Sequence, residues 1–275
     1  MTTPLTPGAA KKSLGQHFLF DPSVLKRVAN AGGSVEGKTV VEVGPGPGGL
    51  TRALLDSGVG KLIAIELDDR FAEGLSLWPE AREGRLHVHH GDALAANIPE
   101  LIAKAGGTSP AMIIANLPYN VGTPMLVEWL KVDGWRGAMV LMFQKEVALR
   151  ICAAADDDHY GRLAVLSQAV TRPRLAITLP PGAFRPPPKV DSAVVVLDPL
   201  PPEQRFNDLA AVETVTAAAF GQRRKMLRAA LKSLDGGLAA LEASGIDPTR
   251  RAETLTQADF RALATAWRAT RSSQV

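Results

Sequence analysis

A turn at 116–120, with the sequence Asn-Leu-Pro-Tyr-Asn, follows an apolar run at 111–115 that is typical of a buried strand. It offers three groups for binding: the amide oxygen of Asn116, the main-chain carbonyl of Leu117 before a rigid proline ring, and the aromatic face of Tyr119. Two such acceptors suit the N–H groups of a planar exocyclic amine, and the ring suits the heterocycle that carries it. The pattern predicts catalysis by positioning and electrostatics, without a strong base.

A glycine-rich turn at 44–49 follows a second apolar run at 39–43 and precedes a helix-compatible segment at 50–55. Glycines let the main chain approach a ligand closely, and a helix N-terminus offers unpaired N–H groups. The next apolar run ends near Glu66, twenty positions after Gly46, where a carboxylate can accept both hydroxyls of a ribose. No lysine of a phosphate-binding loop follows, so an adenosyl cofactor without phosphates, such as S-adenosylmethionine, fits as well as a dinucleotide.

Asp92 comes directly after a third apolar run, at 86–90. Its carboxylate is suited either to an amino group, such as that of a cofactor adenine, or to capping the segment that follows. His87, His89 and His90 accompany it without the cysteine or acidic spacing of a metal site. We therefore expect no bound metal.

A proline-rich loop at 180–190 leaves two interpretations open. The first is a structural segment on the surface, either a stiff loop or a ligand for a proline-recognising domain, and the second is a contribution to the amine site. In the second case Phe184 forms a base sandwich with Tyr119, and Arg185 and Lys189 contact backbone phosphates.

The order of the apolar runs predicts an α/β fold in which a mainly parallel sheet carries helices on both faces. Two further extended segments without a helix between them predict an antiparallel edge pair. The strands are predicted at 39–43, 61–67, 86–90, 111–115, 137–143, 174–179 and 193–197. The helices are predicted near 22–31, 49–57, 69–77, 97–104, 123–131, 144–155, 160–170, 208–220, 222–234, 237–244 and 256–270.

Composition changes after a cluster of prolines near position 200, where strand patterns give way to Ala, Leu and Arg at helical spacing. We expect a flexible arm at 1–12, a catalytic domain at 13–200 and a small helical domain at 203–275. Arg223, Arg224 and Lys225 open a predicted helix of the last domain. Such a run is usually only a solvated face, but it is also suited to RNA.

The whole chain of 275 residues has the composition of a soluble globular protein, with 46% hydrophobic and 21% charged residues and a net charge of +3. No apolar run reaches the length of a membrane span, and the N-terminal segment lacks the apolar core of a signal peptide. The single cysteine, Cys152, excludes an intramolecular disulfide. These features predict a cytoplasmic location.

Eight segments together resemble the small-subunit ribosomal RNA adenine N6-dimethyltransferases over nearly the whole chain. The segments are LGQHFL (14–19), VEVGPGPGGLT (41–51), AIELD (64–68), GDAL (91–94), NLPYN (116–120), FRPPPKVDSAV (184–194), FGQRRKMLRAAL (220–231) and GIDPTRRAETLTQADFRALA (245–264). The resemblance implies a Rossmann-like class I methyltransferase sheet with a helical C-terminal domain. It also implies S-adenosylmethionine-dependent dimethylation of two adjacent adenines near the 3′ end of small-subunit (16S) rRNA, within an immature 30S particle and by a monomer.

The resemblance also implies roles for individual residues. Cofactor contacts are expected from His17, Leu19, Gly44, Gly46, Glu66, Asp92 and Asn116. The acceptor site is expected from Asn116, Leu117, Pro118, Tyr119 and Phe184, and RNA contacts from Arg185, Lys189, Arg223, Arg224 and Lys225. One departure concerns His17, because the family's commonest motif has Asn at that position.

Two other functions compete with this one. The large-subunit adenine dimethyltransferases that confer macrolide resistance share the glycine turn and the Asn-Leu-Pro-Tyr motif, but the segments at 184–194 and 245–264 favour the small-subunit type. A non-catalytic RNA-binding assembly factor is a second alternative. The intact motif at 116–120 favours an enzyme.

Overall fold

The computed structural model describes residues 17–206 and 208–272, so the arm expected at 1–12 lies outside the described residues. The chain divides into two compact units. Of the described residues, the first unit contains 17–148 and 174–198, and the second contains 149–173, 199–206 and 208–272. The boundary after residue 198 lies close to the expected one. The segment 149–173, however, groups with the C-terminal helices rather than with the sheet.

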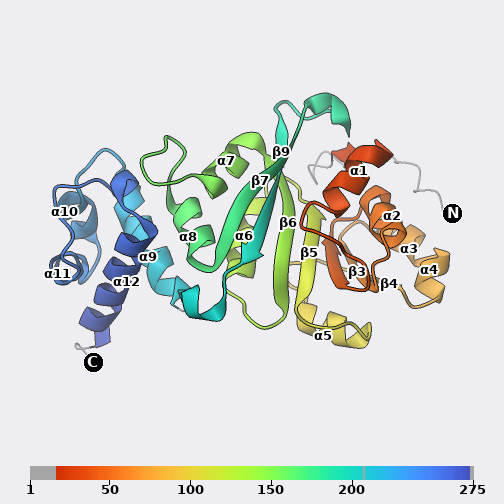
Figure 1. Ribbon diagram of the computed structural model, residues 1–275, viewed down its shortest axis with the longest axis horizontal. Helices are drawn as coiled ribbons and strands as arrows, with labels where there is room; N and C mark the ends of the chain where they lie inside the picture. The colour runs from red at the N-terminus through yellow and green to blue at the C-terminus, as the bar shows by residue number, and fades with distance from the viewer. Residues whose placement is uncertain (1–16, 207, 273–275) are drawn as a thin grey trace. The chain divides into compact units, whose positions relative to one another are not determined.

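A mixed sheet forms the first unit and has the strand order β4-β3-β2-β5-β6-β9-β7, shown in Figure 1. Its strands are β2 (Thr39–Val43), β3 (Lys61–Glu66), β4 (Leu86–His90), β5 (Ala111–Asn116), β6 (Arg136–Gln144), β7 (Thr171–Leu179) and β9 (Ser192–Pro199). The strands from β4 to β6 pair in parallel, and β9 is antiparallel to β6. The seven predicted strands are the strands of this sheet, and the α/β prediction is confirmed.

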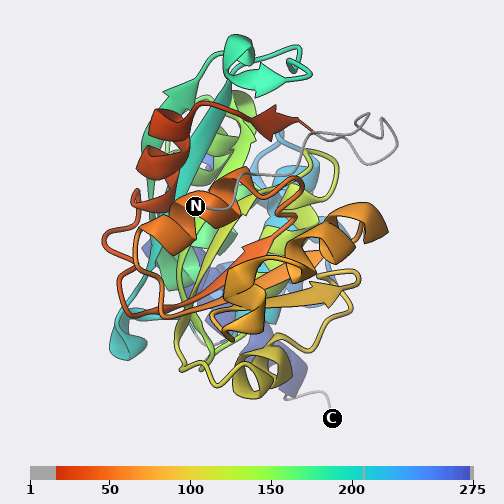
Figure 2. The ribbon, with the colours of Figure 1, turned by 90° about the vertical axis from the view of Figure 1, so that its right-hand side faces the viewer.

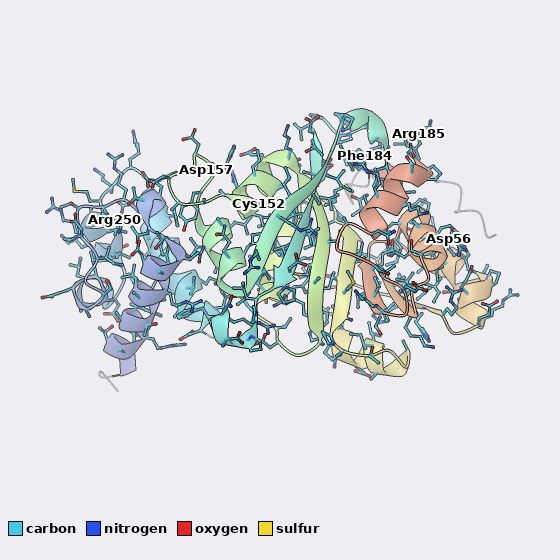
Figure 3. All side chains as sticks on the ribbon, viewed as in Figure 1. Asp56, Cys152, Asp157, Phe184, Arg185 and Arg250 are labelled. Atoms are coloured by element: carbon cyan, nitrogen blue, oxygen red, sulfur yellow. The ribbon has the colours of Figure 1, made fainter. Side chains whose placement is uncertain are left out.

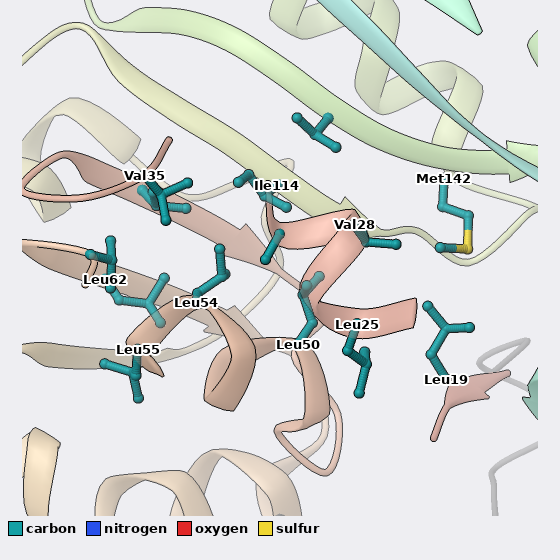
Figure 4. Close-up of a cluster of buried hydrophobic side chains, with 14 of the residues drawn as sticks. Leu19, Leu25, Val28, Val35, Leu50, Leu54, Leu55, Leu62, Ile114 and Met142 are labelled. Carbon is teal, nitrogen blue, oxygen red and sulfur yellow. The ribbon is translucent and has the colours of Figure 1, made fainter. Parts of the chain in front are cut away.

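Helices precede, connect and follow the parallel strands. They are α1 (Pro22–Ala29), α2 (Gly49–Asp56), α3 (Asp69–Ser76), α4 (Pro79–Arg82), α5 (Ile98–Lys104), α6 (Gly122–Leu130) and α7 (Lys145–Cys152). Asp21 caps α1 by accepting from the main-chain N–H of Ser23 at 2.8 Å, and Pro22 occupies the first helical position. Leucines of α1 and α2 pack against Leu62 and Ile114 of the sheet (Figure 4). Burial of these apolar faces holds the two helices against the strands.

The strand order reverses at β2, because the chain runs from β2 outward to β4 and then returns to β5 on the other side. The register aligns the strand ends: Val43 is opposite both Ile65 and Ala115, and Glu66 is opposite His90. Ligands of open α/β sheets bind at the carboxyl ends of the strands where the order reverses. The glycine turn after β2 and the turn after β5 therefore lie next to each other at the place expected for a ligand.

A two-stranded ribbon lies outside the main sheet. Strand β1 (Phe18–Leu19) pairs antiparallel with β8 (Phe184–Arg185), so that Phe18 is opposite Arg185 and Leu19 is opposite Phe184 (Figure 2). The proline-rich segment predicted as a loop thus contains a short strand. This pairing joins the N-terminal segment to a part of the chain far away in the sequence.

The second unit is helical. It contains α8 (Arg162–Val170), α9 (Leu209–Gly221), α10 (Leu227–Ala230), α11 (Gly237–Ala243) and α12 (Gln257–Ser272), with short 3₁₀ turns at Pro202–Gln204, Leu231–Ser233 and Ala252–Thr254. Phe260 and Tyr160 are buried in its core, and the Tyr160 hydroxyl donates to the Leu255 carbonyl at 2.9 Å. The C-terminal helical prediction is confirmed, apart from one helix.

The helix predicted at 222–234 is wrong. Residues 222–226 form a turn and a bridge, and α10 is short. The main-chain N–H of Leu227 donates to the Arg250 carbonyl at 2.8 Å, and that of Arg228 donates to the Pro248 carbonyl at 3.1 Å. Hydrogen bonds to a distant segment replace those that a continuous helix needs.

None of the helices in the described part of the chain is long and apolar enough to cross a membrane.

Candidate active site

A cavity of about 190 Å³ lies at the carboxyl ends of β2 to β5. Most of the predicted cofactor and acceptor residues line it: His17, Gly44, Gly46, Glu66, Asp92, Asn116, Leu117, Pro118 and Tyr119. The glycine turn and the Asn-Leu-Pro-Tyr turn therefore open onto the same space. Leu19 and Phe184, two other predicted site residues, are not among the described residues that line this cavity.

Gly46 lies where no other residue fits without strain. Its φ of +54° is in the left-handed region, and a Cβ built on it would come within 2.6 Å of the Phe18 ring. Its main-chain N–H donates to Glu66 Oε2 at 2.8 Å. The glycine thus brings the turn, β1 and the end of β3 together around the cavity.

Gly46→Ala is expected to lower affinity for the predicted cofactor, S-adenosylmethionine, at least tenfold, because the methyl group displaces the Phe18 ring, which lines the cavity. It should also cost about 2 kcal/mol of folding free energy through left-handed strain and the clash. Calorimetric titration and thermal unfolding measure the two effects. Gly37→Ala is the matched control, since Gly37 has a φ of +69° and open space around it. An equal loss of affinity in the control would contradict the steric explanation.

Glu66 is a buried carboxylate that is held by the main chain. It is 4% exposed, and its Oε1 accepts the N–H of Asp68 at 2.8 Å while Oε2 accepts that of Gly46. Burial raises the pKa of Glu66, and the two main-chain donors oppose that rise. Each oxygen keeps a further lone pair, so the carboxylate can still accept hydroxyl groups from the cavity.

Asp92 lies at the rim of the cavity after β4. Its Oδ1 accepts the main-chain N–H of Leu94 at 2.9 Å, and its carbonyl accepts those of Ala95 and Ala96. Asp92 therefore caps a turn, whereas Asn97 caps α5, the helix that follows. Since Asp92 also lines the cavity, capping does not remove it from the candidate cofactor site.

Asn116 is the last residue of β5 and is partly buried. Its Nδ2 donates to the main-chain carbonyl of His17 at 2.8 Å. The next residues, Leu117 and Pro118, also line the cavity. The amide oxygen of Asn116 and the carbonyl that follows it are the acceptors that a bound amine needs.

The hydroxyl and the ring of Tyr119 each make a contact within the site. Its hydroxyl shares a hydrogen bond of 2.5 Å with Ser192 Oγ, and its ring stacks on the imidazole of His17 with centroids 5.6 Å apart and planes at 26°. Burial raises the pKa of Tyr119, and the Ser192 hydrogen bond opposes that rise. The phenol therefore stays protonated, which suits a stacking and positioning role rather than a basic one.

The predicted sandwich of Tyr119 and Phe184 is not formed. Phe184 is 2% exposed and belongs to the hydrophobic core, because β8 pairs with β1 and places it opposite Leu19. The neighbouring residue Arg185 points the other way, is exposed, and lies over the ring of Phe20 at 4.2 Å (Figure 3). The ring that does contact Tyr119 is that of His17.

All five predicted RNA-contacting residues are exposed, two of them in the first unit and three in the second. Arg185 and Lys189 are exposed on the proline-rich segment, and Arg223, Arg224 and Lys225 are exposed on the turn after α9. Arg223 also donates to the carbonyls of Asp158 at 2.7 Å and Tyr160 at 3.1 Å. Arg223 therefore holds its own turn in place, and Arg185 lies over the Phe20 ring, whereas Lys189, Arg224 and Lys225 are exposed.

The structure also identifies residues that sequence reasoning missed. Phe18 lines the cavity and meets Phe71 edge-on at 5.6 Å, and Ser192 binds the Tyr119 hydroxyl. The unusual mixture of polar and aromatic residues at 13–19 could have indicated that Phe18 belongs to the site. No feature of the sequence indicates Ser192, because its position depends on how the chain returns in β9.

A buried carboxyl lies beneath the glycine turn. Glu42 in β2 is 1% exposed, and neither of its carboxyl oxygens has a hydrogen-bond partner among the described residues. Burial raises its pKa to about 8, outweighing the effect of the nearby Thr51. Glu42 is therefore mostly protonated at neutral pH.

In the described residues no group of three or more His, Cys, Asp or Glu side chains is arranged to hold a metal ion. The sheet order, the glycine turn after β2 and the carboxylate at the end of β3 define the fold as that of a Rossmann-like class I methyltransferase.

The chain belongs to the ribosomal RNA adenine dimethylase family, whose model matches residues 8–267. It is 49% identical to ribosomal RNA small subunit methyltransferase A of Maricaulis maris, covering 94% of this chain and 91% of the relative. It is 53% identical to the protein of that name from Agrobacterium fabrum, covering 93% and 92%.

Two solved structures have the same fold. A dimethyladenosine transferase from Plasmodium falciparum matches with a TM-score of 0.75 and 26% identity, over 90% of this chain and 96% of that one. The 23S rRNA methyltransferase ErmE matches with a TM-score of 0.67 and 22% identity, over 91% and 99%.

Proposed function

We propose that this protein transfers methyl groups from S-adenosylmethionine to N6 of two adjacent adenines near the 3′ end of small-subunit rRNA, giving N6,N6-dimethyladenine. The observation that carries the proposal is that Asn116 and Gly44 line one cavity. An amine held by the first can then meet a methyl donor held by the second. Family membership and the relatives' names support the same reaction.

The residues present fit the proposed cofactor. Glu66 offers buried acceptors for ribose hydroxyls, and Asp92 offers a carboxylate at the rim for an adenine amino group. The turn at Gly44 and Gly46 lets the main chain approach closely, because neither residue has a Cβ. When bound, S-adenosylmethionine supplies an electrophilic methyl group on sulfonium sulfur.

The acceptor side is built from hydrogen-bond acceptors. The target adenine leaves its stack, and its N6 hydrogens are accepted by Asn116 Oδ1 and the Leu117 carbonyl. Tyr119 contacts the heterocycle by stacking. These contacts direct the nitrogen lone pair toward the methyl group, and the proton leaves during or after transfer. After the first transfer one N–H remains, so a single hydrogen bond must orient the amine for the second.

The relatives at 49% and 53% identity carry the small-subunit name, which favours that substrate over large-subunit rRNA. The match to ErmE supports the fold alone, since identity is 22%. We also propose that the substrate is rRNA in an immature 30S particle, that the protein acts as a cytoplasmic monomer, and that the helical unit docks on the particle.

Arg224 and Lys225 are proposed to contact phosphates. Replacing both with Ala is expected to weaken binding to the 30S precursor and to reduce the slope of log K against log[salt] by about 2, because each phosphate contact contributes about 1. Filter binding across a salt series measures the slope. Lys38→Ala is the control, since Lys38 is exposed at the amino end of β2. An unchanged slope in the double variant would exclude these contacts.

The proposed reaction is tested with purified protein, S-adenosylmethionine and two substrates: 30S precursors that lack the methyl groups, and protein-free large-subunit RNA. We expect dimethyladenine by mass spectrometry in the first substrate only. Methylation confined to the second would favour the macrolide-resistance type. Particle binding without binding of S-adenosylmethionine in a calorimetric titration would indicate a non-catalytic assembly factor.

A further inference from the structure

His17 contacts the acceptor side of the cavity through both its main chain and its ring. Its carbonyl accepts Asn116 Nδ2 at 2.8 Å, its Nδ1 is 2.8 Å from the Pro186 carbonyl, and its ring lies on Tyr119. The family resemblance implies a cofactor contact at this position. Two of the described contacts of His17 go instead to the turn that is proposed to hold the amine, and the third goes to Pro186 of the proline-rich segment.

The first of these contacts determines which way the Asn116 amide faces. Its oxygen and nitrogen ends have nearly the same shape, so hydrogen bonding decides the orientation. The His17 carbonyl can only accept a hydrogen bond and therefore selects the NH₂ end. The opposite end, Oδ1, remains as the acceptor for another group. Without this contact the amide can rotate and present a donor to an amine that also donates.

The ring of His17 holds Tyr119 and the proline-rich segment together. Because the Pro186 carbonyl can only accept, Nδ1 must carry the proton in this hydrogen bond. The ring centroids of His17 and Tyr119 are 5.6 Å apart, whereas a base between two rings needs about 7 Å. His17 therefore supports one face of Tyr119 in this conformation and leaves no room there for a nucleobase.

We propose that His17 is a positioning residue for the target amine, acting through the Asn116 amide and the Tyr119 ring. The carbonyl of His17 keeps Asn116 Oδ1 available to the amine. The imidazole is hydrogen-bonded to the Pro186 carbonyl and stacks on Tyr119. It thereby fixes the positions of the N-terminal segment and of the Tyr119 ring relative to the turn at 116–120. This inference rests on the proposed function and extends it to the residue that directly precedes β1.

The test compares His17→Ala, His17→Phe and wild type in three measurements: the affinity for S-adenosylmethionine, the single-turnover rate on undermethylated 30S particles, and the ratio of monomethyl to dimethyl adenine. For His17→Ala we expect affinity within about twofold of wild type and a rate lowered about tenfold or more. Monomethyl adenine should accumulate, because the second transfer depends on one remaining N–H. His17→Phe keeps the ring contact and should recover part of the rate.

His159→Ala is the matched control, because His159 is a partly exposed histidine of the helical unit. Thermal unfolding of each variant separates loss of fold from loss of positioning. A tenfold loss of cofactor affinity with an unchanged rate at saturation would overturn the inference, as would a wild-type product ratio in His17→Ala. So would a His17→Phe variant no faster than His17→Ala. If wild type itself fails to methylate adenine, the proposed function fails instead.

Discussion

Asn116→Ala is expected to lower the methyl-transfer rate by about 10²–10³-fold, while affinity for S-adenosylmethionine changes no more than severalfold. We expect the methyl-transfer rate to fall rather than the cofactor affinity, because the amide oxygen orients the amine and stabilises the charge that develops on it during transfer. Single-turnover kinetics on undermethylated 30S particles measure the rate, and calorimetric titration measures the affinity.

Asn120→Ala is the matched control, since Asn120 belongs to the same turn and lines the same cavity but lies beyond Tyr119. It should retain a rate within severalfold of wild type. Near-normal dimethylation by Asn116→Ala would remove the amide from the mechanism. An equal loss of rate in both variants would indicate that the turn has merely become less ordered.

Glu42→Gln is expected to stabilise the protein at pH 8 by a few kcal/mol relative to wild type and to lose most of that advantage at pH 5. Burial without a hydrogen-bond partner raises the pKa of Glu42 from about 4.5 to about 8. The folded wild type therefore holds a proton that the unfolded chain releases between these values. Wild-type stability should fall by about 1.4 kcal/mol for each pH unit in that window.

Glutamine carries no ionisable proton, so the variant lacks this part of the pH dependence. Urea unfolding at half-unit steps from pH 5 to pH 8 measures the difference. Glu36→Gln makes the same substitution on an exposed residue and should follow wild type. Parallel stability curves for Glu42→Gln and wild type would show that Glu42 stays ionised in the folded protein.

The sheet and its ligand-binding edge were predictable from the sequence because both depend on local patterns. Apolar runs bounded by glycine or proline identify strands, and alternation with helical segments identifies a parallel sheet. A parallel sheet brings the carboxyl ends of its strands to one edge. The convergence of Gly44, Glu66, Asp92 and Asn116 on one cavity follows from that geometry.

The failures concern parts whose partners are far away in the chain. The helix predicted at 222–234 gives way to hydrogen bonds with residues 248 and 250. Segment 149–173 groups with the C-terminal helices, although it lies between two strands in the sequence. Helical periodicity describes which face is apolar, but it does not say which surface will cover that face.

The amino-acid sequence by itself determined the fold class, the glycine turn and the amine-binding turn, because each depends on residue types within a few positions of one another. Only the tertiary structure decided which rings meet at the site. Antiparallel pairing of β1 with β8 buries Phe184 and exposes Arg185, and it brings His17 onto Tyr119. These contacts join residues about 70 to 170 positions apart, and their partners are chosen by packing and hydrogen-bond geometry rather than by local pattern.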